Sequence, residues 1–129
     1  MRKSPTCGRV IDLRLAPALI TLLAASGCAP EPTQALPEFL QELTASIEAA
    51  DEAESPGSIW RYTYKDGIVY YVPPMPCCDH LSTLYDEGGA ILCAPDGGIT
   101  GDGNGRCSDF FELRSGETRV WQDPRVPGR

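Results

Sequence analysis

The chain has 129 residues, six of them cysteines, and a formal net charge of −7 at neutral pH. A chain this acidic lacks the basic face that phosphate binding requires, which excludes nucleic acid as a partner. The same deficit of lysine and arginine excludes binding to anionic lipids through a polybasic patch.

The first 27 residues predict an export signal. Four basic side chains come first: Arg2, Lys3, Arg9 and Arg14. The apolar run "LAPALITLLAAS" follows them, which is the pattern of a secretory signal, and it is shorter than the roughly 20 residues of a membrane span. The ending "LAASGC" resembles a bacterial lipoprotein signal. The resemblance implies removal of residues 1–27 and a lipid such as palmitate on Cys28, anchoring the exported chain to the cell-envelope bilayer (the outer membrane in a Gram-negative source). An ordinary signal peptide cut elsewhere is the alternative.

Residues 28–54 predict a tether followed by a helix. Without residues 1–27 the chain keeps 7 basic and 17 acidic residues, a net charge of −10, and residues 31–54 contain no base. This composition, with prolines near its start, predicts a solvated tether over 28–36. Leu40, Leu43 and Ile47 recur at helical spacing, which predicts an acidic amphipathic helix over 37–54. We expect its apolar side to pack on its own domain rather than on a partner.

The stretch "SIWRYTYKDGIVYYV" predicts a β-hairpin. Asp66-Gly67 between two β-rich runs indicates a two-residue turn, which would pair Tyr64 with Val69 and Tyr62 with Tyr71. Five side chains then share one face: Trp60, Tyr62, Tyr64, Val69 and Tyr71. Such an aromatic face belongs to a core or stacks on a sugar ring, and we expect the core.

The remaining segments predict a second hairpin, a short element and a last strand. "STLYD" and "AILCA" form the hairpin, and "ETRVWQD" the last strand. "SDFFELR" predicts either a short helix capped by Ser108 or a hairpin arm turning at Ser115-Gly116. Residues 125–129 are expected to fray. The sum is an α+β fold: a small disulfide-stapled antiparallel sheet of hairpins over residues 55–124, with one N-terminal amphipathic helix.

Four cysteines of the predicted mature domain indicate two disulfides, because exported proteins fold in an oxidising compartment. They are Cys77, Cys78, Cys93 and Cys107. Adjacent Cα atoms lie about 3.8 Å apart, below the usual disulfide range, so we expect the Cys77/Cys78 doublet to bond to Cys93 and Cys107 in an order left open. Zinc held by these cysteines and His80 is the weaker alternative, because paired C-x₂-C spacing is missing.

The glycine-rich loop 95–109 contains side-chain oxygens that could bind calcium, which is the alternative to a purely structural loop. The candidate ligands are Asp96, Asp102, Asn104 and Asp109. The spacing fails the EF-hand pattern at its first and last positions, so tight glycine turns are the preferred interpretation and no metal or cofactor is expected. A single histidine gives no strong case for a catalytic triad, and only a carboxylate pair among Asp79, Asp86 and Asp96 would suggest an enzyme.

Five segments in this order are similar to an uncharacterised family of small bacterial lipoproteins and secreted domains. They are "SIWRYTYKDGIVYYV", "CCD", "STLYDEGGAILCAPDGG", "GDGNGRCSDF" and "VWQDPR", within about residues 56–126. The resemblance implies one cysteine-stapled envelope domain and no known activity. We expect a non-enzymatic binding or structural module for an envelope protein or ligand. The alternatives are a calcium-dependent module and an inhibitor of an extracellular enzyme.

Overall fold

The computed structural model describes residues 35–77 and 79–127, and its centre is a five-stranded antiparallel sheet. The strands follow the order β4-β3-β2-β1-β5, so consecutive strands are neighbours except where β5 returns to the edge beside β1. Their bounds are β1 Ser58–Tyr64, β2 Gly67–Val72, β3 Thr83–Asp86, β4 Ile91–Cys93 and β5 Ser115–Gln122. The two predicted hairpins and the predicted last strand are present.

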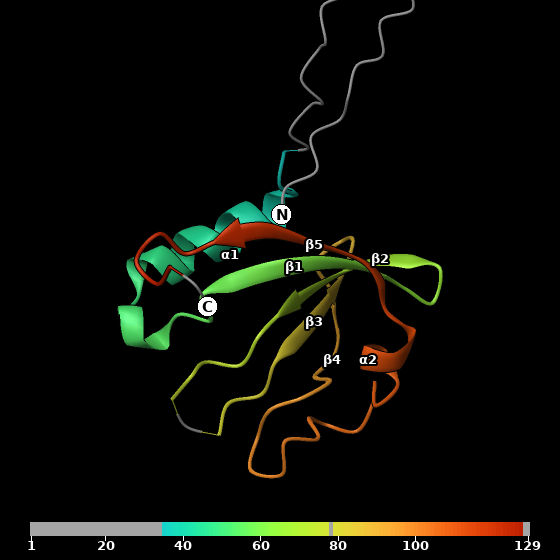
Figure 1. Cartoon of the computed structure of the whole chain (residues 1–129). Coiled ribbons are helices and arrows are strands. Elements are labelled where there is room, and N and C mark those ends of the chain that lie inside the picture. The colour runs from blue at the N-terminus through green and yellow to red at the C-terminus, as the bar shows by residue number, and fades with distance from the viewer. Residues whose placement is uncertain (1–34, 78, 128–129) are drawn as a thin grey trace, which may run out of the picture. The chain divides into compact units, whose positions relative to one another are not determined.

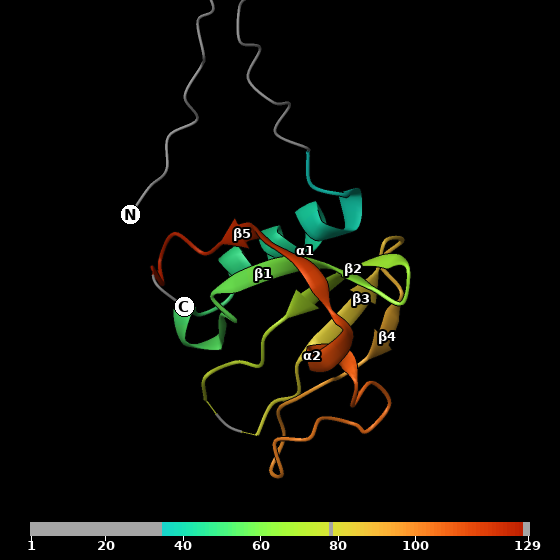
Figure 2. The same ribbon diagram turned by 45° about the vertical axis from the view of Figure 1, so that its right-hand side comes forward.

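The two faces of the sheet are covered differently (Figures 1 and 2). Helix α1 (Glu38–Ala49) lies along one face, and the short helix α2 (Phe110–Leu113) lies on the other, beside the loop between β4 and α2. Because side chains alternate along a strand, each strand contributes to both layers. The fold is therefore α+β with two helices.

Phe110 of α2 is the centre of the first core, on the face that carries the predicted aromatic side chains. It is fully buried and contacts the rings of Tyr62, Tyr64 and Tyr71 at centroid distances of 5.4–5.6 Å. Burial of an aromatic side chain of this size contributes about 1.5–3 kcal/mol. The aromatic face is thus core, and its buried tyrosines are not available to stack on a sugar.

The β1–β2 hairpin turns one residue earlier than predicted. Lys65 and Asp66 are the two turn residues, both with positive φ (47° and 64°), and Tyr64 pairs with Gly67. The ladder consequently pairs Tyr62 with Val69, not with Tyr71. The shift moves every partner by two positions, so the predicted division of side chains between the two faces is unchanged.

Helix α1 packs its apolar side on the second face. Leu40 is fully buried in a cluster with Ile59 and Tyr70, and Leu43 and Ile47 pack against this cluster. The helix ends at Ala49, before the predicted limit at residue 54, and a separate 3₁₀ turn follows at Glu52–Glu54. Among the described helices none is both long and apolar enough to cross a membrane.

Two further predictions need correction. Asp109, not Ser108, precedes the first residue of α2, and its side chain makes no capping hydrogen bond. The segment 125–127 is also not frayed, because Val126 is buried and the Arg125 side chain bonds to three carbonyl oxygens at the end of α1. The predicted signal 1–27 and most of the predicted tether, together with Cys28 and Cys78, lie outside the described residues.

Candidate functional site

The disulfide of the domain joins Cys93 at the end of β4 to Cys107 just before α2, with 6.1 Å between the Cα atoms. Both cysteines are buried in the core around Phe110. The prediction that Cys77 and Cys78 bond to Cys93 and Cys107 is therefore wrong, because Cys93 and Cys107 bond to each other. The zinc alternative fails for the same reason, since disulfide sulfurs are not the thiolates that zinc requires.

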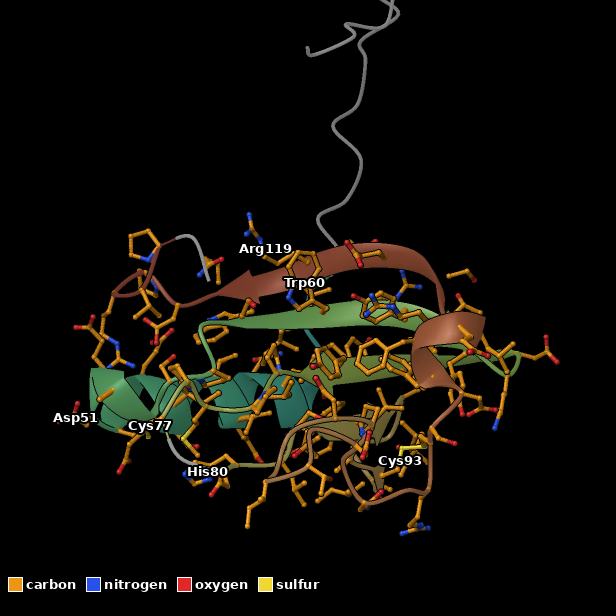
Figure 3. All side chains as sticks on the ribbon, turned by 60° about the horizontal axis from the view of Figure 1, so that its bottom comes forward. Asp51, Trp60, Cys77, His80, Cys93 and Arg119 are labelled. Carbon is orange, nitrogen blue, oxygen red and sulfur yellow. A yellow bond between two sulfur atoms is a disulfide. The ribbon has the colours of Figure 1, made fainter. Side chains whose placement is uncertain are left out.

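Cys77 has an exposed, free thiol in the loop between β2 and β3. Asp79 and His80 in the same loop are exposed as well. Figure 3 shows Cys77 and His80 on one side of the molecule and the disulfide at Cys93 on another. Cys77, Asp79 and His80 thus lie on the surface of one loop, and the disulfide closes a different loop.

That closed loop, residues 94–106, is fixed to the domain at its base. The Tyr71 hydroxyl donates to both carboxylate oxygens of Asp96 at 2.9 Å. The buried Ser82 donates from its hydroxyl to the Asp96 carbonyl at 3.0 Å, and the Asp96 amide donates back to the Ser82 hydroxyl at 3.1 Å. Burial and the bond to Asp96 raise the pKa of Tyr71 well above its usual range, so this donor keeps its proton.

Two glycines allow the loop backbone to pack more closely than other residues could. A Cβ at Gly97 would lie 2.3 Å from the His80 carbonyl oxygen, and one at Gly103 would lie 2.0 Å from that of Ala94. Both have positive φ (85° and 64°), and a side chain at either would strain the backbone. Backbone bonds from Gly98 to His80 and from Asn104 to Ala94, each 2.9 Å, complete the connection. The loop is therefore held in one conformation.

Ile99 lies at the tip of this loop and exposes 88 % of its surface. Leu81, on the adjacent segment, bridges to Gly97 and is 47 % exposed. An isolated exposed leucine is ordinary on a protein surface. An almost fully exposed isoleucine is a stronger feature, and this one lies on a backbone held by a disulfide and close glycine contacts.

The four calcium candidates do not converge. The Asp96 carboxylate accepts from Tyr71, and the Asp109 carboxylate accepts from the Tyr64 hydroxyl at 2.5 Å and pairs with Lys65 at 2.8 Å. The Asn104 side-chain oxygen accepts from the Arg106 amide. In the part of the chain that the structure describes, no group of three or more His, Cys, Asp or Glu side chains is placed to hold a metal.

Asp79, Asp86 and Asp96, the acids in which a carboxylate pair would suggest an enzyme, have separate surroundings. The Asp86 carboxylate accepts from the amides of Gly88 and Ala90 and so closes the β3–β4 turn. Asp96 is held by Tyr71, while Asp79 is exposed in its loop. Each of the three has a local role or faces solvent.

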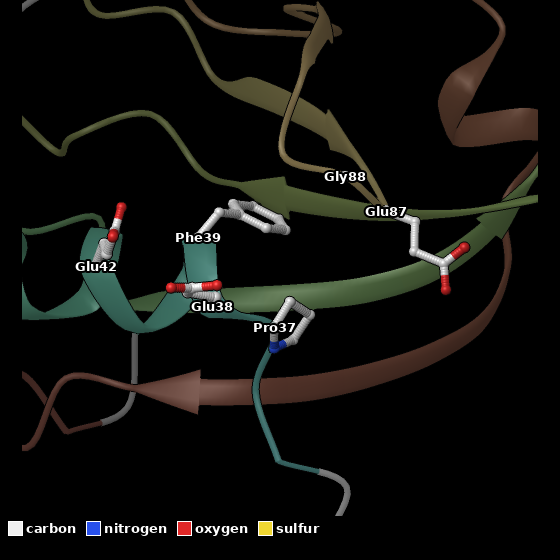
Figure 4. Close-up of a pocket in the computed structure, with 6 residues that line it drawn as sticks. All are labelled: Pro37, Glu38, Phe39, Glu42, Glu87 and Gly88. Atoms are coloured by element: carbon white, nitrogen blue, oxygen red, sulfur yellow. The ribbon is translucent and has the colours of Figure 1, made fainter.

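A shallow groove lies where α1 meets the β3–β4 turn (Figure 4). It has a volume of about 350 Å³ and is lined by Pro37, Glu38, Phe39, Glu42, Glu87 and Gly88. Its three acids come from two elements and surround the half-buried Phe39 ring. This acidic groove is open to solvent.

The glycine-rich loop was expected from the sequence, but the contacts that fix it and the exposure of Ile99 were not. The useful indications were an apolar Ile99 within "PDGGITGDGNG" and the alternation that directs Tyr71 toward the loop. Neither shows from sequence alone that the loop is fixed, because the bonds to Ser82 and His80 connect segments 14 or more residues apart.

A family model described as a domain of unknown function (DUF6970) matches residues 45–123. No curated protein and no solved structure matches the chain significantly. The family match agrees with the resemblance to an uncharacterised domain, and the lipid anchor and the bacterial envelope remain predictions. The chain belongs to the family of the domain of unknown function DUF6970.

Proposed function

We propose that the domain is a non-enzymatic binding module of the bacterial cell envelope that presents the loop 94–106 to a protein partner. The observation that carries this proposal is the 88 % exposure of Ile99 on a loop fixed by the Cys93–Cys107 disulfide. A pre-ordered loop loses little conformational entropy on binding, so one apolar anchor contributes more than it would on a flexible chain. The partner would offer an apolar pocket for Ile99.

The proposed location rests on the lipid-modified Cys28. Acyl chains contribute about 0.8 kcal/mol per buried CH₂, and more than one chain is needed for a stable anchor. The intact mass of the exported chain tests this directly. A lipid-sized mass increase that disappears in Cys28→Ser supports the anchor, and an unmodified thiol on a chain cut elsewhere contradicts it.

If the partner is an extracellular hydrolase, the domain would act as an inhibitor of that enzyme. The same loop supports it, because inhibitory loops owe their affinity to being fixed before they bind. A panel of extracellular proteases, assayed with and without the domain, separates inhibition from simple binding.

The binding proposal is tested with a photo-reactive residue in place of Ile99. We expect a discrete cross-linked species in envelope extract, competed away by unlabelled protein but not by the Ile99→Asp variant. The matched control is Ser108→Asp, which adds the same charge at an exposed site outside the loop and should compete like the wild type. Equal competition by Ile99→Asp would contradict the role of the loop tip.

A further inference from the structure

An apolar pocket lies at the turn end of the β1–β2 hairpin, apart from the loop tip. It has a volume of about 400 Å³ and is lined by Tyr64, Lys65, Gly67, Ile68, Val69, Asp86, Leu92, Arg106 and Cys107. One wall is therefore the hairpin and another the disulfide-closed segment. The volume lies within the range of about 300–1,000 Å³ that is typical of small-molecule sites.

The interior of this pocket is apolar because its floor is the edge of the core around Phe110. Val69 and Cys107 are buried members of that core, and Leu92 packs against it while remaining partly exposed. Gly67 lies on the same face of β2 as Val69, since side chains alternate along the strand. A Cβ at Gly67 would meet only the Tyr64 carbonyl oxygen, at 3.7 Å. The missing side chain at Gly67 thus leaves this space open.

Two basic side chains border the pocket, which is notable in a predicted mature chain with 17 acids and 7 bases. Arg106 is exposed, and its guanidinium makes no hydrogen bond or ion pair among the described residues. Lys65 pairs with Asp109 at 2.8 Å and stays more than half exposed. The one acid in the lining, Asp86, already accepts from two backbone amides.

We propose that this pocket binds a small aliphatic carboxylate, with the chain against Val69 and Leu92 and the carboxylate at Arg106 and Lys65. The apolar lining accounts for the chain, because removing apolar surface from water is favourable. The free guanidinium accounts for the charge, because an arginine binds a carboxylate through two parallel hydrogen bonds. This ligand site is separate from the partner-binding loop tip and goes beyond that function.

The test uses the full chain carrying Cys28→Ser, with decanoate as the probe below its micelle concentration. Calorimetry should give saturable binding of one decanoate, weaker binding of decanol and none of decyltrimethylammonium. Equal binding of the three compounds would overturn the proposal, because it would leave the two bases without a role. Binding of anionic phospholipid vesicles without binding of decanoate would overturn it as well.

Three variants locate the site. Arg106→Gln should weaken decanoate binding about tenfold or more, because the charged hydrogen bonds of the guanidinium are lost, and Arg106→Lys should retain part of the affinity, because it keeps the charge but not the two parallel bonds. Gly67→Ile should abolish binding by filling the pocket, and its φ allows a side chain without strain. Wild-type affinity in either Arg106→Gln or Gly67→Ile would refute the assignment.

The controls separate this site from the rest of the molecule. Arg119→Gln removes an exposed base that stacks over Trp60 and should bind decanoate like the wild type. Ile99→Asp should also bind normally, so failure of the loop-tip proposal and failure of this one are distinguishable. The apolar N-terminal run is the same in every variant, so any decanoate that it binds does not affect the comparison between variants. A fall in affinity common to all variants would contradict a site at this pocket.

Discussion

Arg125 makes two parallel hydrogen bonds to the fully buried Asp123, at 3.0 Å from Nε and 2.8 Å from Nη2. The same guanidinium donates to the carbonyl oxygens of Ile47, Glu48 and Ala50 at the C-terminal end of α1. The last carbonyls of a helix lack partners within the helix, and a cation there is favourable. One side chain thus connects the end of β5 to the end of α1.

We expect Arg125→Gln to lower the melting temperature by about 5 °C or more, because it leaves a buried carboxylate without its cation. Arg119→Gln is the matched control, since it removes the same charge from an exposed position of β5. Thermal unfolding followed by circular dichroism measures both. Equal melting temperatures for the two variants would show that the connection contributes nothing to stability.

Acid should weaken the same connection. The Arg125 guanidinium holds the pKa of Asp123 well below its usual range, and the Ser55 hydroxyl lowers it further. A depressed folded-state pKa stabilises the fold above the unfolded-state value, and this contribution is lost as pH falls below about 4. Urea unfolding at pH 7 and pH 3 should show a larger loss for the wild type than for Asp123→Asn. An equal loss in the two proteins would exclude Asp123 as the source.

Alkali should weaken the first core. Burial, with a hydrogen bond to Glu117, raises the pKa of Tyr62 from 10.0 to about 12. A raised folded-state pKa means that the stabilisation is complete below pH 10 and is lost as pH rises from 10 toward 12. Absorbance titration of tyrosinate should show at least one group ionising near pH 12. Glu117→Gln should lower that value, whereas Glu112→Gln, which removes an exposed acid of α2, should leave it unchanged.

The disulfide prediction failed through one assumption. It assumes that all four thiols pair, in which case excluding a bond between the adjacent Cys77 and Cys78 also excludes the Cys93–Cys107 bond. The structure leaves Cys77 free and exposed, so the assumption does not hold. Cys93 and Cys107 meet because β4 and the start of α2 pack on the same core around Phe110, a contact that spacing alone does not reveal.

Removing the disulfide therefore has a defined consequence. The bond closes a segment with a sequence separation of 14, for which loop-closure entropy predicts a stabilisation of about 3 kcal/mol. Cys93→Ala/Cys107→Ala should lose about that much in urea unfolding, while Cys77→Ala should unfold like the wild type. In the native protein a thiol reagent should label Cys77 and leave Cys93 and Cys107 unmodified, as peptide mass mapping would show.

Much of the architecture followed from local patterns, and the errors followed from long-range contacts. Alternation along β1 and β2 assigned the aromatic side chains to the correct face because it does not depend on where the turn lies. The turn lies at Lys65-Asp66 and not at Asp66-Gly67. Pairing along the whole β1–β2 ladder determines the register, and it outweighs the local turn preference of the Asp-Gly dipeptide. The tail was predicted to fray because nothing in its composition indicates that Arg125 reaches carbonyls more than 70 residues away.

The glycines of the closed loop provide the sharpest test of its rigidity. Gly103 and Gly105 both have positive φ, but a Cβ at Gly103 would overlap the Ala94 carbonyl oxygen, whereas one at Gly105 would meet no atom within 4 Å. Gly105→Ala should cost about 1 kcal/mol from backbone strain alone, and Gly103→Ala more than about 2 kcal/mol because the backbone must also move. Urea unfolding gives both values. Gly103→Ala should further weaken cross-linking from position 99, because the tip would lose its fixed position, while Gly105→Ala should preserve it. Equal destabilisation by the two substitutions would mean that the close contact at Ala94 does not hold the loop.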